Sequence, residues 1–204
     1  MPLNGLRVVA LEQAVAGPFC SRQLADHGAD VIKIERPDGG DSARAYDDVL
    51  NGTSAYFAWL NRGKQSVVLD LKVGAERDAC SRLIDAADVV VNNLAPGAME
   101  RLGFGYDEVS ARNPRIVWCG ISGYGPDGPM RDKKAYDMLV QAESGVVSVT
   151  GSDDANRQRS AFRSPTSRRG CTRTRRSCTA LYARDARASA NASTSRCSSA
   201  SPSG

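Results

Sequence analysis

The sequence has 204 residues, with 27 Lys and Arg against 23 Asp and Glu, a formal net charge of +4. The charge is unevenly spread, because residues 1–156 carry a net charge of −6 and residues 157–204 a net charge of +10. The basic total is therefore no indication of a nucleic-acid-binding protein. With no charged-then-apolar leader and no long apolar run, we expect a cytoplasmic protein that does not enter a membrane.

Five short apolar runs alternate with amphipathic or capped segments along the first 120 residues. The runs predict strands at residues 7–11, 30–34, 66–69, 88–91 and 116–120. The segments between them predict helices at residues 18–27 and 75–87, with a third beginning near Pro96. This alternation predicts an α/β fold, a Rossmann-like open parallel sheet with helices on both faces.

Charged residues follow the predicted strands where the chain leaves the sheet. Arg36 comes directly after the second strand, ahead of Pro37 and two glycines. Ligands of open α/β sheets bind at the carboxyl ends of the strands, and a guanidinium placed there suits a phosphate. A solvent-exposed arginine in an ordinary loop is the alternative. The glycines between Gly120 and Gly128 do not follow the G-x-G-x-x-G spacing, so we expect no dinucleotide cofactor.

The C-terminal segment, residues 157–204, differs from the rest of the chain. It holds eleven Arg, no Lys and one acidic residue, Asp185, and it contains no Val, Ile, Met or Trp. Such a composition buries too little apolar surface to offset the entropy lost on ordering, so we expect disorder. A basic tail that binds RNA or anionic lipid, a solvated linker and an out-of-frame translation product are the three interpretations.

Six motifs resemble the family III CoA-transferases, the group of formyl-CoA transferase, carnitine CoA-transferase and the bile-acid-inducible enzymes, which is related to α-methylacyl-CoA racemase. The motifs are P-L-N-G-L-R-V-V-A-L-E (2–12), A-G-P-F-C (16–20), G-A-D-V-I-K-I-E-R-P-D-G-G-D (28–41), N-R-G-K-Q-S-V-V-L-D-L-K (61–72), A-D-V-V-V-N-N-L-A-P-G-A-M-E-R-L-G-F (87–104) and G-Y-G-P-D-G-P (123–129). The resemblance covers residues 1–156, which would form the N-terminal part of the family's α/β domain.

The resemblance implies a site for coenzyme A. The positions that match the family's CoA contacts are Val15, Ala16, Arg36, Leu69, Lys72, Asn93, Leu94, Ala95, Arg101, Lys134, Tyr136 and Asp137. It implies no permanently bound cofactor and no metal, because the CoA thioester is itself a substrate. The partners it implies are an acyl-CoA and a small carboxylic acid and, for the intact enzyme of the family, a second copy in an intertwined homodimer.

The family's reaction proceeds through a carboxylate nucleophile. An Asp attacks the acyl-CoA thioester to form a mixed anhydride, CoA then forms an aspartyl thioester, and the acceptor acid completes the exchange. That Asp lies in an A-D-I-A-A-G segment, and the corresponding place here holds Pro165 and Thr166. Neither residue can serve as the nucleophile, and Asp153 and Asp154 come too early and suit a turn. We therefore expect this chain to be inactive, and we expect it to fold poorly because it ends before the family's sheet and dimer are complete.

Reading the codons in a shifted frame permits A-D-I-A-A-G-M-Y around residues 164–172 and R-I-D-V-S-M around residues 191–197. Both segments fit the family at about the right separation. Of the three interpretations of residues 157–204, we therefore prefer a frameshift.

Two rival functions remain open. In the racemase relatives the position of Tyr136 resembles a His that transfers protons, and a tyrosine side chain, with a reference pKa of about 10, is a poor base at neutral pH. Tyr136 therefore favours CoA transfer over racemisation. The second rival is a non-catalytic fragment that binds CoA or nucleic acid.

The remaining sulfur and imidazole groups suggest structural roles. Cys20, Cys80 and Cys119 lack metal-ligand spacing and are expected to be reduced core thiols. The single histidine, His27, is expected at the end of a helix.

Overall fold

The computed structural model describes residues 1–149, 151–152, 156–157 and 172–181. Five strands form one parallel sheet in the order β3-β2-β1-β4-β5. They are β1 (Arg7–Leu11), β2 (Asp30–Glu35), β3 (Lys64–Val68), β4 (Val89–Asn92) and β5 (Val117–Gly120). The predicted strands are thus confirmed, with shifts of one or two residues at some ends.

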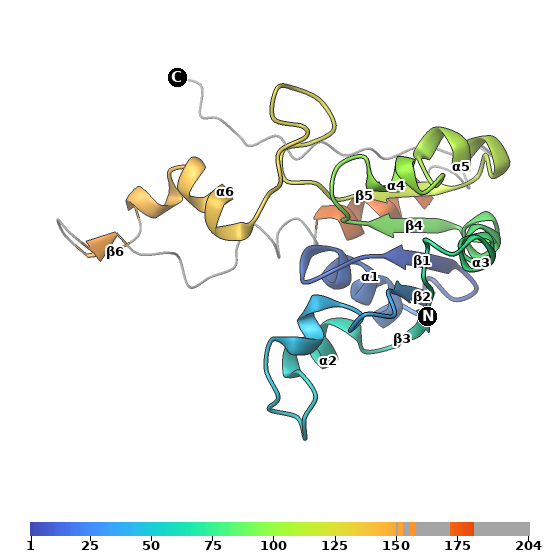
Figure 1. Cartoon of the computed structure of the whole chain (residues 1–204), viewed down its shortest axis with the longest axis horizontal. Helices are drawn as coiled ribbons and strands as arrows, with labels where there is room; N and C mark the ends of the chain where they lie inside the picture. Colours follow the sequence, from blue (N-terminus) through green and yellow to red (C-terminus); the bar gives the residue numbers. More distant parts are fainter. Residues whose placement is uncertain (150, 153–155, 158–171, 182–204) are drawn as a thin grey trace.

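Helices follow or connect these strands (Figure 1). They are α1 (Ala16–Asp26), η1 (Ser42–Ala45), α2 (Ala55–Asn61), α3 (Gly74–Asp85), α4 (Ala98–Arg101), α5 (Tyr106–Arg112), α6 (Asp137–Glu143) and η2 (Val146–Val149). A short antiparallel pair, β6 (Gly151–Ser152) and β7 (Asn156–Arg157), comes after η2. In Figure 1, α6 and β6 lie well away from the sheet.

The sheet separates two apolar layers, as alternation of side chains along a strand requires. On one face Val8, Val31 and Val89 pack with Cys20 and Leu24 of α1. The other face carries the core residues Val9, Ile32, Val90, Cys80, Ile84, Met99, Phe104 and Val109, contributed by strands, α3, α4 and the segment through α5. Helices on both faces confirm the predicted fold class.

Part of the segment at residues 157–204, for which the composition predicts disorder, is helical. Residues 172–181 form a helix, drawn in orange-red in Figure 1. Ala180 and Leu181 are buried in the same layer as α1, and the Thr174 hydroxyl donates to the carbonyl of Cys20 at 3.3 Å. Enough apolar surface is therefore present in this stretch to pack one helix, which the average composition of the segment concealed.

The strand order reverses between β1 and β4. From β1 the chain proceeds outward through β2 to β3, and then returns to β4 and β5 on the opposite side. Such a reversal leaves a crevice outside the carboxyl ends of the two central strands. A ligand site is therefore expected at the segments that follow β1 and β4.

The cysteine and histidine predictions are confirmed. Cys20, Cys80 and Cys119 are free, buried thiols, and burial raises the pKa of Cys80 to about 12. His27 is the C-cap of α1 and its Nδ1 lies 2.6 Å from the Gln23 carbonyl oxygen. In the part of the chain that the structure describes, no group of three His, Cys, Asp or Glu side chains could hold a metal, and no helix is long and apolar enough to cross a membrane.

Candidate functional site

A cleft of about 740 Å³ opens at the crevice between β1 and β4. Nine of the twelve residues predicted for CoA line it: Val15, Ala16, Arg36, Asn93, Leu94, Ala95, Lys134, Tyr136 and Asp137. They come from the segments after β1, β2, β4 and β5, which parallel topology gathers at one edge of the sheet.

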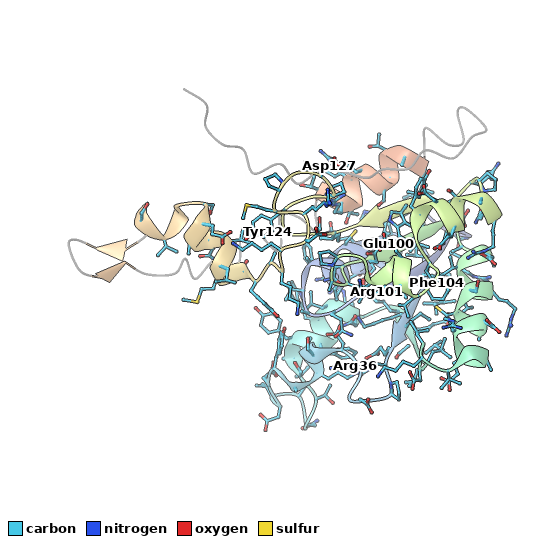
Figure 2. All side chains as sticks on the ribbon, turned by 45° about the horizontal axis from the view of Figure 1, so that its top comes forward. Arg36, Glu100, Arg101, Phe104, Tyr124 and Asp127 are labelled. Atoms are coloured by element: carbon cyan, nitrogen blue, oxygen red, sulfur yellow. The ribbon has the colours of Figure 1, made fainter. Side chains whose placement is uncertain are left out.

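The other three predicted residues do not line the cleft. Leu69 packs against the core layer under α3, and Lys72 is exposed. Arg101 is exposed at the end of α4, with guanidinium nitrogens 3.4 and 3.5 Å from the carbonyl of Pro96, which does line the cleft. Figure 2 shows the two arginines on different segments, Arg36 in the loop after β2 and Arg101 at the end of α4.

Asn93 fixes the turn that enters the cleft after β1. Its Oδ1 accepts from the backbone N–H of Gln13 at 2.8 Å, and its Nδ2 donates to the Gln13 carbonyl at 2.8 Å. The second residue of α1, Gly17, has no room for a side chain, because a Cβ there would lie 2.8 Å from the Glu12 Cβ and 2.9 Å from the Asn93 Oδ1. Glycine thus permits the close approach that brings α1 to the segment after β4.

Asp41 holds the same turn from the other side. Ala14 adopts a left-handed backbone conformation, with φ of 63°, which is unfavourable for a residue other than glycine. Its N–H donates to Asp41 Oδ1 at 2.8 Å, and the same oxygen accepts from Ala43 N–H at 2.9 Å. The loop after β2 thereby compensates for backbone strain in the turn after β1.

Four charged side chains form a buried network beneath these two loops. Lys33 Nζ lies 2.7 Å from Asp41 Oδ2 and 3.4 Å from Glu12 Oε1, and Lys64 Nζ lies 2.7 Å from that Glu12 oxygen. All four side chains are at most 2% exposed. Two ammonium groups face two carboxylates, so the formal charges balance, as burial requires.

The network shifts the pKa of two of its members. Burial by itself would raise the pKa of Glu12, but the ammonium groups of Lys64 and Lys33 outweigh it and hold that pKa below its usual value. Burial lowers the pKa of Lys64 despite the neighbouring Glu12. Lys64 is further held by the carbonyl of Pro18 and by Asn61, each at 2.9 Å.

A second ion pair orders the loop that carries Arg36. Glu35 receives two hydrogen bonds from the Arg44 guanidinium, at 2.8 and 2.7 Å, and one from the Ser66 hydroxyl at 2.6 Å. Burial alone would raise the pKa of Glu35, but these partners lower it to about 2. Arg36 Nε in turn donates to the Gly40 carbonyl at 3.0 Å, so the guanidinium is oriented at the cleft.

The far wall of the cleft comes from the segment before α6. A Cβ on Gly123 would lie 1.9 Å from the Ala135 Cβ, so glycine is required where the chain crosses itself. This crossing places Lys134 and Tyr136 opposite the turn after β1. Asp137 accepts from Gln141 Nε2 at 2.8 Å, and Tyr136 is 64% exposed.

The cleft presents more positive than negative groups. Arg36, Lys133 and Lys134 line it against one carboxylate, Asp137, although Lys133 is also ion-paired with Glu143. The eleven-residue helix α1 also begins there, with Val15 as an N-cap that supplies no side-chain hydrogen bond and with no acidic residue in its first turn. Exposed cations together with an uncapped helix start favour an anionic ligand.

Several lining residues are not among those predicted from the sequence. They are Gln13, Ala14, Ser42, Tyr46, Pro96, Ile121, Ser122, Gly123, Lys133, Ala135 and Val140. Gln13 and Ser122 closely follow strand ends, so the rule that identified Arg36 could have found them. Tyr46 reaches the cleft from a loop between η1 and α2, and no local pattern indicates that.

The model of CoA-transferase family III matches residues 3–190. The chain belongs to this family. The predicted resemblance ended near residue 156, whereas the family model extends through the helix at residues 172–181.

Relatives of this family III chain include the acetyl-CoA:oxalate CoA-transferase of Acetobacter aceti, 43% identical over 153 residues, and the succinate–glutarate CoA-transferase of Agrobacterium fabrum, 41% identical over 160 residues. Each match covers 75% of this chain but only 39% and 40% of the relative. Among solved structures, a CAIB/BAIF family protein from Brucella suis superposes with a TM-score of 0.88 at 33% identity, covering 94% of this chain and 52% of the other. The family III chain thus spans two fifths of these curated relatives and about half of this solved structure.

Proposed function

We propose that the cleft binds coenzyme A thioesters and that the reaction it serves is CoA transfer between an acyl-CoA and a small carboxylic acid. The convergence of Arg36, Lys134 and the start of α1 on one cleft is the observation that carries this proposal. CoA is a long polyanion, so its phosphates suit the cations and its pantetheine arm suits backbone groups along Asn93–Ala95. The named activities of the two relatives, on oxalate and on succinate with glutarate, support small carboxylic acids as acceptors.

Arg36 and Lys134 would pair with phosphate oxygens. Asn93 would hold the turn after β1 in place beside the pantetheine arm. Arg101 and Lys72 remain proposed contacts from outside the cleft, because long side chains at a rim can reach a ligand larger than the cavity. Tyr136 and Asp137 would lie nearest the acyl group.

Isothermal titration calorimetry with CoA tests the proposal. We expect Arg36→Ala to weaken CoA binding at least about tenfold, the effect of losing one hydrogen-bonded charge pair. Arg77→Ala on α3, another exposed arginine that does not line the cleft, is the matched control and should bind like the wild type. Equal affinities for CoA and for pantetheine, which lacks the phosphates, would contradict the role of the cations.

The chemical step is proposed to use an aspartyl anhydride and then an aspartyl thioester, as in the family resemblance. The place of that Asp, around Pro165 and Thr166, lies outside the described residues. We propose that the chain binds CoA but does not complete transfer, and that a frameshift near codons 155–160 removed the nucleophile. Resequencing those codons tests this; an intact gene in the present frame would refute it.

Two further parts of the proposal have independent tests. The intact, frame-corrected enzyme is proposed to be a homodimer, which would show twice its chain mass in sedimentation equilibrium. Racemisation is the rival reaction, and it predicts deuterium exchange from solvent into the α-carbon of a branched acyl-CoA without any acceptor acid. The Tyr136 position disfavours such exchange.

A further inference from the structure

Lys64 opens the edge strand β3, directly after the turn that follows α2. Gly63 makes this turn with a φ of 76°, a left-handed conformation that favours glycine. The turn brings two basic side chains to α1. Arg62 pairs with Asp26, the last residue of that helix, whereas the Lys64 ammonium reaches the carbonyl of Pro18 in its first turn.

The three N–H donors of the Lys64 ammonium match three acceptors from three elements. They are Glu12 Oε1 at 2.7 Å, just after β1, the Pro18 carbonyl at 2.9 Å, and Asn61 Oδ1 at 2.9 Å, at the end of α2. Asn61 is itself held by its Nδ2, which donates to the Phe57 carbonyl at 2.9 Å. Because the Lys64 side chain is only 2% exposed, these contacts are shielded from water.

Glu12 extends the same support to the second turn of α1. The Ser21 hydroxyl lies 2.8 Å from both Glu12 carboxylate oxygens, and Ser21 is fully buried. Lys64 therefore holds Pro18 directly and Ser21 through Glu12. These contacts span the segment between β1 and α1, in which Val15 and Ala16 line the cleft.

Lys64 itself does not line the cleft. Its charge is directed at the buried Glu12 carboxylate, so direct attraction of an anionic ligand does not explain its placement. What the ammonium controls is the position of the helix start, where backbone N–H groups without an intrahelical acceptor favour negative charge.

We propose that Lys64 is a positioning residue for CoA binding, whose ammonium holds the first turn of α1 at the cleft from beneath. The inference rests on the proposed CoA function of the cleft. Lys64 acts through α1 and does not touch the ligand.

Two variants separate this role from the stability of the fold. Lys64→Met removes the ammonium at similar length but leaves Glu12 with less compensating charge, so its Tm should fall. In the double variant Glu12→Gln/Lys64→Met one charge of each sign is lost and the buried Lys33–Asp41 pair remains. Its Tm should therefore lie above that of Lys64→Met, while the Pro18 carbonyl still lacks its donor.

Arg62→Met is the matched control. It removes a basic side chain two positions earlier, which pairs with Asp26 at the opposite end of α1 at 2.9 Å. Arg62 is half-exposed and does not line the cleft. This variant should keep the wild-type affinity for CoA.

Hydrogen–deuterium exchange of the full chain without ligand measures the hold on α1. In the double variant the amides of residues 16–21 should exchange at least about fivefold faster than in the wild type. The amides of α3 should exchange at the wild-type rate, and Arg62→Met should leave residues 16–21 unchanged.

Isothermal titration calorimetry with CoA measures the consequence for binding. We expect the double variant to bind with a Kd about fivefold higher and an unchanged stoichiometry, since every folded molecule has a displaced helix start. A merely structural role would lower the Tm or the stoichiometry and leave the Kd at its wild-type value.

The outcomes distinguish this inference from the proposed function. If the wild type binds no CoA, the proposed function fails, and the link from Lys64 to the ligand fails with it. If the wild type binds CoA and the double variant keeps either the wild-type Kd or the wild-type exchange at residues 16–21, the positioning role alone is overturned.

Discussion

Lys33 Nζ lies 2.7 Å from Asp41 Oδ2, and both side chains are at most 1% exposed. This pair connects the middle of β2 to the loop that follows it, and Asp41 carries the connection to the strained Ala14 in the turn after β1. A buried charge pair thus maintains the spacing between two walls of the cleft. Its effect on the site is through position, since neither residue lines the cleft.

Lys33→Met should destabilise the fold strongly, because it leaves the Asp41 carboxylate buried without its cation. We expect a loss of about 3–5 kcal/mol in the free energy of unfolding, measured by urea denaturation. Arg7→Ala, which removes the half-exposed pair with Asp30 at 3.5 Å, should cost no more than about 1 kcal/mol. Equal losses in the two variants would contradict the structural importance of the buried pair.

The stability of the fold should decrease in acid through Glu35. Its pKa is about 2 in the folded chain against an ordinary value of 4.5. A carboxylate with a lowered folded pKa contributes stability that is complete above about pH 4.5 and is lost as the pH falls to about 2. With allowance for the partly exposed Arg44, the contribution is about 2 kcal/mol.

Urea denaturation from pH 7 to pH 2 measures this contribution. Glu35→Gln should be less stable than the wild type at pH 7, and the difference should shrink as the pH falls below about 4.5. A constant difference over the whole range would show that Glu35 does not titrate with a lowered pKa.

Gly17→Ala tests whether the close approach of α1 to Asn93 shapes the cleft. The new Cβ would meet the Glu12 Cβ at 2.8 Å and the Asn93 Oδ1 at 2.9 Å, so the turn after β1 must move. We expect about 1–3 kcal/mol of destabilisation and weaker CoA binding by calorimetry. Gly74→Ala, at an unobstructed position at the start of α3, should change neither quantity by a comparable amount.

The sequence predicted the strands well because buried parallel strands are short apolar runs, as at residues 7–11 and 30–34. It missed α2 and α5, which have only seven residues each. The cap of α2 lies in Ser54, whose hydroxyl accepts from Phe57 N–H, a local signal that was available. Local sequence patterns therefore predict the type of the longer elements better than they predict that the shortest helices exist.

The residues that line the candidate site could be predicted in outline. The buried charged residues that hold its loops in place could not. Arg36 and Asn93 follow strands and are therefore expected at the sheet edge, where the structure places them. Nothing local distinguishes Lys33 or Lys64 from a surface lysine, because their burial depends on Glu12 and Asp41 from other segments. Lys72 illustrates the opposite case, since a matching motif placed it in the site and its side chain is exposed outside the cleft.

The chain as encoded should not transfer CoA. Pro165 and Thr166 occupy the place expected for the nucleophilic Asp, and neither side chain can form an acyl anhydride. Incubation with acetyl-CoA or succinyl-CoA and either oxalate or glutarate, followed by chromatography of the CoA esters, should show no exchange above the reaction without protein.

A gene corrected by one base near codons 155–160 should encode the Asp, and the protein made from it should exchange CoA between these acids. Replacing that Asp by Asn in the corrected protein should then abolish exchange while CoA still binds, because the cleft residues Arg36, Asn93 and Lys134 precede the corrected segment. Transfer by the uncorrected chain would mean that another group, from the described or the undescribed residues, serves as the nucleophile.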